Sequence, residues 1–206
     1  MLRQPARALL IDLDGVLRRW DPTVAKMVEE SYDLIPGTLL QTAMTWELLR
    51  PAVAGELTDA QWMAAVAARL PLPAAQGSAA VAKWQEHRGY VDPDVLAFLR
   101  TVRAAGLPVG LATNATDLLR GDLAALGLAG EFDAVISSWE LKIHKPAPEF
   151  FAAACAELGQ EPPWVLFVDD DDRSVLGARA AKMPAFRWTG PQDIPYLLRA
   201  LGLPAA

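Results

Sequence analysis

Cysteine is almost absent from this chain of 206 residues, with Cys155 as its single example. One cysteine excludes an intrachain disulfide and a metal site built from several thiolates. Because Cys155 ends the apolar stretch 150–155, we interpret it as a buried side chain rather than as a nucleophile.

Positive charge is also scarce. The chain has 19 Lys and Arg residues against 25 Asp and Glu residues, so its formal net charge is −6 and its pI is near 4.9. No run of Lys and Arg with interleaved aromatic residues occurs. Since nucleic acids bind large basic surfaces, we expect no nucleic-acid partner.

Near the amino terminus a long apolar run is missing. The run Ala8 to Ile11 is too short for the core of a signal peptide or for a membrane span, and Asp12 ends it. We therefore predict a cytoplasmic protein without a membrane partner, while the oligomeric state stays open. The composition, with 52% hydrophobic and 21% charged residues, is globular, and the length suits one domain with an insertion.

Short apolar runs that end at polar or acidic residues predict buried strands. Four are clear and a fifth, Ala185 to Trp188, is weaker; the four are Ala8 to Ile11, Pro108 to Ala112, Phe132 to Ile136 and Trp164 to Val168. Helical spacing occurs in Pro93 to Ala105, Thr116 to Leu126 and Pro148 to Leu158. This alternation predicts an α/β fold with a parallel sheet, and ligands then bind at the carboxyl ends of the strands.

The region Trp20 to Tyr90 interrupts the alternation, with no convincing strand. It holds helical segments around Thr23 to Tyr32, Leu39 to Leu49, Thr58 to Leu70 and Ala79 to Arg88. We therefore assign residues 1–18 and 91–206 to an α/β core and residues 19–90 to a small helical insertion. Three tryptophans fall in it, and they either fill the core of a small bundle or include one that faces a substrate: Trp46, Trp62 and Trp84.

Two carboxylates stand where the first predicted strand ends. Side chains alternate along a strand, so Asp12 and Asp14 point the same way, and Gly15 then permits a sharp turn. Such a pair suits a divalent cation together with nucleophilic or acid and base chemistry. The alternative is an acidic turn without a chemical role.

Polar groups also follow the next three strands. Thr113 and Asn114 suit either an anionic phosphate or a helix cap. After the third strand, Lys145 can neutralise phosphoryl charge, although most surface lysines do not. After the fourth come four acids, 169–172, which suit either a divalent cation or a solvated loop that caps a helix.

This ordered set resembles the haloacid dehalogenase-like hydrolase superfamily, in its phosphatase branch with a helical cap between the first two motifs. The resemblance runs from Leu9 to Trp188. The matching stretches are Asp12-Leu13-Asp14-Gly15-Val16-Leu17, Thr113-Asn114, Lys145 to Phe151 and Val168-Asp169-Asp170. It implies a Rossmann-like parallel sheet with the first strand central and a cap formed by residues 19–90.

The resemblance also implies an enzyme, a Mg²⁺-dependent hydrolase of phosphomonoesters that uses an aspartyl-phosphate intermediate. Asp12 is then the nucleophile and Asp14 the acid and base, while Thr113, Asn114 and Lys145 hold the phosphoryl group. Mg²⁺ lies on Asp12, the backbone carbonyl of Asp14, and Asp170, with Asp169 assisting. The implied substrate is a small phosphorylated metabolite, for which a sugar phosphate is one candidate.

One position departs from the family pattern. Four residues past Asp170 the family commonly has Asp or Asn, whereas this chain has Ser174. We expect a weaker orientation of the metal ligands, with Asp171 as a compensating group.

Three other functions stay open. A sugar phosphomutase shares the aspartyl-phosphate. A 2-haloacid dehalogenase needs no metal, and Asp14 argues against it because that branch usually lacks this carboxyl. A catalytically silent binding module of the same fold has Ser174 as its support.

Overall fold

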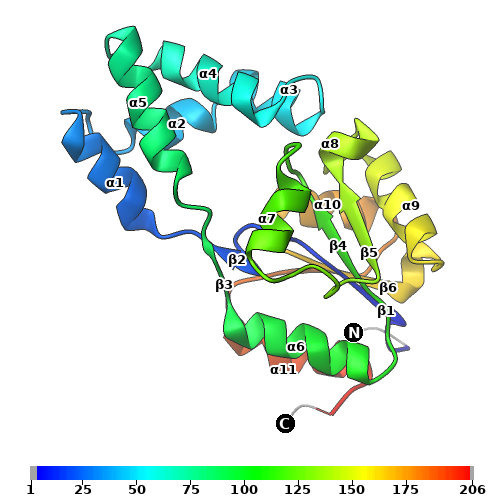
Figure 1. Cartoon of the computed structure of the whole chain (residues 1–206). Helices are drawn as coiled ribbons and strands as arrows, with labels where there is room; N and C mark the ends of the chain where they lie inside the picture. Colours follow the sequence, from blue (N-terminus) through cyan, green and yellow to red (C-terminus); the bar gives the residue numbers. More distant parts are fainter. Residues whose placement is uncertain (1–3, 205–206) are drawn as a thin grey trace.

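A computed structural model of the chain describes residues 4–204 (Figure 1). Its centre is a parallel sheet of five strands in the order β5-β4-β1-β6-β7. The strands are β1 (Ala8–Ile11), β4 (Val109–Thr113), β5 (Ala134–Ser137), β6 (Val165–Asp169) and β7 (Ala185–Arg187). The predicted α/β fold is confirmed, with β1 in the middle and the weak fifth strand at one edge.

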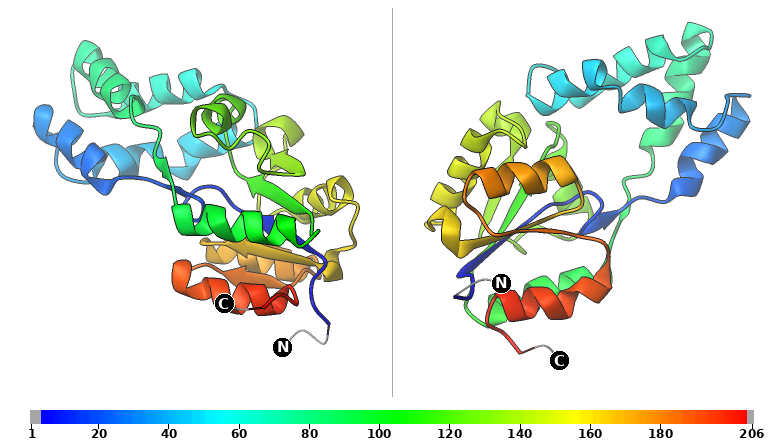
Figure 2. Two further views of the ribbon diagram at one scale, coloured as in Figure 1. Left: turned by 60° about the horizontal axis from the view of Figure 1, so that its bottom comes forward. Right: turned by 180° about the vertical axis from the view of Figure 1, so that it is seen from behind.

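Helices cover both faces of the sheet because its strands are apolar on both sides. On β1, Leu9 and Ile11 join one core cluster, whereas Ala8 and Leu10 join the other. The first cluster takes side chains from α6 (Pro93–Ala104), α7 (Leu119–Ala125) and α11 (Ile194–Ala200), and the second from α9 (Pro148–Glu157) and α10 (Asp172–Ala180). Figure 2 shows α6 and α11 side by side under the sheet. Buried Cys155 belongs to the second cluster, as predicted.

Five helices form the insertion, which lies beyond the carboxyl ends of the strands (Figures 1 and 2). They are α1 (Pro22–Ser31), α2 (Thr38–Ala43), α3 (Trp46–Val53), α4 (Asp59–Arg69) and α5 (Ala74–Gln85). The insertion has its own hydrophobic core, in which Trp62 is buried and against which Trp84 packs. Trp46 instead stays 50% exposed. The interpretation of the tryptophans as bundle core therefore holds for two of the three.

Three predicted helices differ from the structure. The one predicted around Ala79 to Arg88 is α5, which runs from Ala74 to Gln85; the other two differences have a local cause. The predicted helix Leu39 to Leu49 is broken between α2 and α3, where the Thr45 hydroxyl donates to the Gln41 carbonyl at 2.8 Å and the chain turns. Helix α7 begins at Leu119 and not at Thr116, because the side chains of Thr116 and Asp117 bond to the insertion instead.

Further elements were not predicted. The insertion is joined to the sheet by a short antiparallel pair, β2 (Arg18–Arg19) and β3 (Tyr90–Val91). The segment that leaves the core for the insertion and the segment that returns from it therefore lie side by side. The remaining elements are α8 (Ser138–Leu141) and two 3₁₀ turns, Pro162–Trp164 and Pro191–Asp193.

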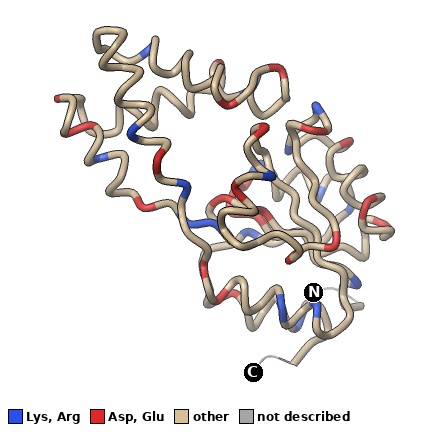
Figure 3. The backbone as a smooth tube through the Cα atoms, viewed as in Figure 1, with Lys and Arg blue, Asp and Glu red and all other residues tan. Residues whose placement is uncertain are grey.

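No helix within residues 4–204 combines the length and the apolar character that crossing a membrane requires. Lys and Arg are spread over the core and the insertion (Figure 3). The cytoplasmic location remains a prediction.

Candidate active site

Asp12 lies at the carboxyl end of the central strand. Its backbone N–H donates to the Val168 carbonyl at 2.9 Å, so it continues the pairing of β1 with β6. The neighbouring strands end at Thr113 and Asp169, and both side chains are buried. Because β1 is central, the first predicted motif is flanked on both sides by the second and the fourth.

Gly15 brings the Asp170 carboxylate close to the loop that follows Asp12. The residue has a φ of 81°, in the left-handed region, and a Cβ at this position would overlap the Asp170 carboxylate. Any side chain at position 15 therefore strains the backbone and displaces Asp170. The glycine of the first motif is thus required by a contact with the fourth.

Lys145 extends into the centre of this cluster. Its Nζ lies 2.8 Å from Asp12 Oδ1 and 2.6 Å from Asp169 Oδ2, and the residue is 4% exposed. Its backbone is held by Asn114, whose side-chain amide accepts from the Lys145 N–H at 2.8 Å and donates to the Lys145 carbonyl at 3.1 Å. The amide side chain predicted to bind phosphate therefore positions the lysine.

Burial dominates the electrostatics of the cluster. It raises the pKa of Asp12 to about 7, with Lys145 offsetting the effect in part and Asp169 adding to it. Burial alone would lower the pKa of Lys145, but the two carboxylates outweigh it, so the pKa of this ammonium is raised. Lys145 consequently stays charged, and it is the cation that balances the two buried acids.

Three carboxylates are suitably placed for a cation. Oxygens of Asp12, Asp169 and Asp170 lie within 4.8 Å of one another. Although Asp12 Oδ1 is close to Lys145 Nζ, it receives no hydrogen bond of good geometry and is buried. An unsatisfied buried carboxylate oxygen among other carboxylates matches the preference of Mg²⁺ for oxygen ligands. The residues present therefore fit the predicted metal.

Asp171 and Ser174 are hydrogen-bonded to each other. Asp171 is the N-cap of α10, and its Oδ2 accepts from the Ser174 N–H at 2.9 Å and from the Ser174 hydroxyl at 3.0 Å. Asp171 lies outside the group of three carboxylates described above. Its carboxylate serves the helix cap, so this arrangement does not show the compensation for Ser174 expected from the sequence.

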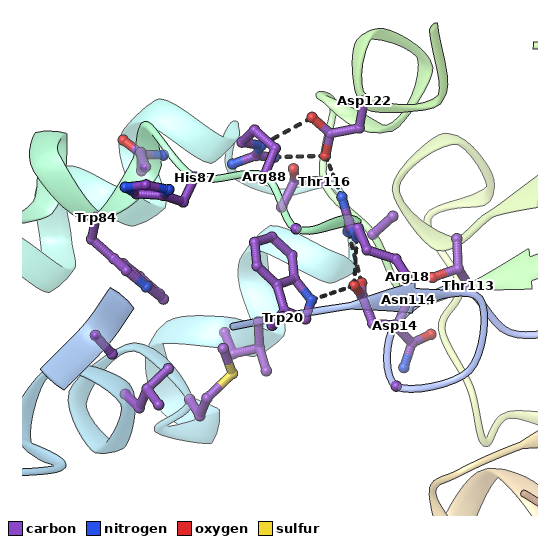
Figure 4. Close-up of a pocket in the computed structure, with 18 of the residues that line it drawn as sticks. Asp14, Arg18, Trp20, Trp84, His87, Arg88, Thr113, Asn114, Thr116 and Asp122 are labelled. Atoms are coloured by element: carbon purple, nitrogen blue, oxygen red, sulfur yellow. Dashed lines mark hydrogen bonds and ion pairs between the residues drawn. The ribbon is translucent and has the colours of Figure 1, made fainter. Parts of the chain in front are cut away.

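Asp14 faces a different set of partners (Figure 4). Both of its oxygens accept from the Arg18 guanidinium, at 2.6 and 2.8 Å, and Oδ1 also accepts from Trp20 Nε1 at 2.6 Å. Arg18 in turn donates to Asp122 at 2.7 Å, and Asp122 accepts two bonds from Arg88. The second carboxylate of the first motif is thus tied to both connections between the core and the insertion.

Sequence reasoning missed this network. Arg18 directly follows the first motif, and in the structure it is 6% exposed and paired with two acids, Asp14 and Asp122. Asp122 stands beside Leu119 and Leu123 on the buried face of α7. An acid on the apolar face of a predicted helix was the available signal, because a buried carboxylate needs a partner.

The insertion contacts the core through α3, through the loop that follows it and through Asp59 at the start of α4. The Lys142 ammonium donates to the Gly55 carbonyl at 2.8 Å, and Trp139 Nε1 donates to the Leu57 carbonyl at 3.1 Å. The ring of Trp46 meets His144 edge to face, with centroids 5.2 Å apart. These contacts hold the insertion over the strand ends, and between the two lies an open cavity of about 1040 Å³ that the carboxylate cluster lines.

A family model described as haloacid dehalogenase-like hydrolase matches residues 6–182. The chain belongs to the haloacid dehalogenase-like hydrolase family. It is a hydrolase by this membership, and curated relatives of this hydrolase are phosphatases.

Two of these relatives differ in how much they share with this hydrolase. Fructose-1-phosphate phosphatase YqaB of Escherichia coli is 26% identical over 86% of this chain and 93% of its own length. The phosphoserine phosphatase of Thermus thermophilus is 38% identical over 55% of this chain and 48% of its own length. The alignment thus spans about half of the Thermus enzyme.

Solved structures of other family members have the same fold as this hydrolase. A HAD family enzyme of Bacteroides thetaiotaomicron superposes with a TM-score of 0.74 at 20% identity, over 95% of this chain and 100% of the other. A structure of that wild-type protein in complex with magnesium and inorganic phosphate gives a TM-score of 0.69 at 19% identity and covers 89% and 94%. The L-2-haloacid dehalogenase RSc1362 gives 0.70 at 25% identity and covers 89% and 86%.

Proposed function

We propose that this protein is a Mg²⁺-dependent phosphomonoester hydrolase that acts on a small phosphorylated metabolite through an aspartyl-phosphate. The observation that carries the proposal is the buried Asp12 carboxylate, placed among Lys145, Asp169 and Asp170 in the cavity that Thr113 and Asp14 also line. The phosphatase relatives and the neighbour that holds magnesium and phosphate support it.

Asp12, Asp170 and the backbone carbonyl of Asp14 would hold the metal. When bound, Mg²⁺ supplies positive charge that lets an anionic carboxylate approach an anionic phosphate. Asp169 serves the site through Lys145, because one of its oxygens accepts from the ammonium and the other from the Asp171 N–H at 2.8 Å. This assignment accounts for each acid of the cluster.

The side chains of this chain divide the reaction into two transfers. The Asp12 carboxylate attacks phosphorus and forms the aspartyl-phosphate, while Lys145 and Thr113 hold the phosphoryl oxygens. Asp14 gives its proton to the departing alkoxide oxygen. In the second transfer, Asp14 takes a proton from the water that attacks the same phosphorus, which frees inorganic phosphate and the Asp12 carboxylate.

Asp14 must change partners to do this. In the structure its oxygens accept from Arg18 and Trp20, so a proton bound for the leaving group requires a break in that ion pair. Arg18 lies in β2, at the connection to the insertion. We propose that residues 19–90 act as a cap whose movement about β2 and β3 presents Asp14 to the substrate and excludes bulk water.

Hydrolysis of a chromogenic aryl phosphate tests the proposal. Wild-type protein with Mg²⁺ should release phosphate, and a chelator or Asp12→Asn should abolish the release. Asp170→Asn should raise the Mg²⁺ concentration needed for half-maximal activity. Asp172→Asn is the matched control and should leave that concentration unchanged, because Asp172 lies in the same acidic run but is ion-paired with Arg187.

Four outcomes would overturn the proposal. Activity that survives the chelator or Asp12→Asn removes the mechanism. Halide release from a short 2-haloacid without Mg²⁺ establishes a dehalogenase. An isomerised sugar phosphate in place of free phosphate establishes a mutase. Binding of Mg²⁺ and phosphate without turnover of any ester in a broad panel establishes a silent module.

A further inference from the structure

The inner face of the helical insertion is unusually apolar for a surface that meets solvent. Ten large apolar side chains are exposed within residues 4–204. Six of them line the cavity that contains Asp12, namely Trp20, Met27, Leu40, Met44, Trp46 and Tyr90. Exposed apolar side chains that gather at one site mark a place where an apolar ligand is bound.

This apolar wall starts beside the reacting groups. The indole N–H of Trp20 donates to Asp14, and the Arg18 guanidinium lies 4.6 Å above the Trp20 ring, so the ring is held in place. In Figure 4, Trp20 and Trp84 face the same space between the insertion and the strand ends. A group attached to a phosphate at Asp12 would therefore have the Trp20 ring, the start of this wall, close to it.

Much of the hydrogen-bonding capacity of the cavity is already used within the protein. Asp122 accepts from Arg18 and Arg88, and Asp59 accepts from Thr116 and Gln85. Asp21, at the start of α1, caps that helix through Thr23. The hydroxyls of a sugar would have to share these acceptors with the donors that already occupy them, whereas an apolar group leaves the pairs intact.

We propose that the substrate is the phosphate monoester of an apolar alcohol, whose alkyl or aromatic group packs against this wall. The inference rests on the proposed function, because it names the leaving group of that same reaction. The cavity, at about 1040 Å³, lies at the upper end of the range for small-molecule sites and has room for such a group beyond the phosphate.

A series of n-alkyl phosphates tests this. Ethyl, butyl and hexyl phosphate present the same reacting atoms and differ in apolar length alone. We expect kcat/KM to rise about fourfold for each added methylene, and hence about 200-fold from ethyl to hexyl phosphate. Glucose 6-phosphate should be a poorer substrate than hexyl phosphate.

Variants localise the effect to the wall. Met27→Gln and Met44→Gln change side chains that are 53% and 51% exposed, so both variants should fold. Each should reduce the ratio of kcat/KM for hexyl over ethyl phosphate at least fourfold. Leu176→Gln is the matched control, since Leu176 is 61% exposed on α10 outside the cavity and should leave the ratio unchanged.

The outcomes separate this inference from the function beneath it. If no phosphate ester, the aryl ester included, is hydrolysed, the proposed function fails and the inference fails with it. If the aryl ester is hydrolysed but kcat/KM is flat along the alkyl series, or glucose 6-phosphate is preferred, the function stands and the inference is overturned. If Met27→Gln changes the molecular mass measured by light scattering but leaves the ratio of kcat/KM for hexyl over ethyl phosphate unchanged, the wall is an interface between copies of this chain. That result also overturns the inference.

Discussion

Replacing Asp122 by asparagine removes the charge that holds both connections to the insertion. The carboxylate accepts from Arg18 at 2.7 Å, and from Arg88 at 3.0 and 2.7 Å. The side chains of Asp122 and Arg18 are 11% and 7% exposed, whereas that of Arg88 is 29% exposed. Breaking a buried pair costs about 3–5 kcal/mol because it leaves a charge unpaired. Arg18 keeps its bonds to Asp14 and Arg88 is partly exposed, so we place this case at the lower limit, about 3 kcal/mol.

A loss of that size is large enough to measure. For a chain of this length, about 3 kcal/mol corresponds to a decrease in Tm of about 6–12 °C, which thermal unfolding followed by circular dichroism resolves. The two arginines outweigh burial and lower the pKa of Asp122 below its ordinary 3.8. The stabilisation is therefore complete at pH 7 and is lost only as the pH falls through the lowered pKa.

Glu140→Gln is the matched comparison. Glu140 also pairs with an arginine, Arg120, but the two side chains are 42% and 60% exposed. An exposed pair contributes about 0.2–1 kcal/mol, so the Tm should change by less than about 4 °C. If Asp122→Asn and Glu140→Gln lowered the Tm equally, the reasoning from burial would be refuted.

Two further predictions concern Gly15 and Cys155. Gly15→Ala should abolish phosphatase activity because the added Cβ displaces Asp170. The control is Gly127→Ala: Gly127 has a φ of 70° and open space around the added Cβ, so this variant should cost about 1–2 kcal/mol of stability and keep the activity. Equal activities of the two variants would show that the overlap with Asp170 is harmless. Burial raises the pKa of the Cys155 thiol to about 11, so thiolate forms in the native protein only near that pH. Ellman's reagent at pH 8 should therefore label the unfolded chain within minutes and the native protein far more slowly, and rapid native labelling would contradict the burial.

The features of the fold that depend on residues close together in the chain could be predicted from the sequence. Alternating faces and apolar runs placed β1 and β6, and with them Asp12 and Asp169 at strand ends, because a parallel sheet brings its carboxyl ends to one edge. The sequence did not predict the partners of Asp122, which lie 104 residues away at Arg18 and 34 away at Arg88. Such pairs depend on the path of the chain through space.

The same limit applies to side chains whose surroundings are assembled from several elements. Trp46 and Trp62 look alike in the sequence, yet Trp46 is half exposed and its ring contacts His144, whereas Trp62 is buried in the core of the insertion. The sequence predicts Asn114 as a phosphate ligand, which stays a prediction, and it gives no sign that the Asn114 side chain also holds the Lys145 backbone. Residue type predicted the chemistry available at each position, and the fold decided how that chemistry is used.

The pairing of β2 with β3 has an evolutionary consequence. Because the insertion leaves at Arg19 and returns at Tyr90, which are paired neighbours, its length can change without moving the strands that carry the carboxylates. Doubling such a loop costs only about 0.6 kcal/mol in chain entropy. During evolution, an insertion with a different substrate preference can thus replace this one at the β2–β3 junction, while the strands that carry the carboxylates stay the same.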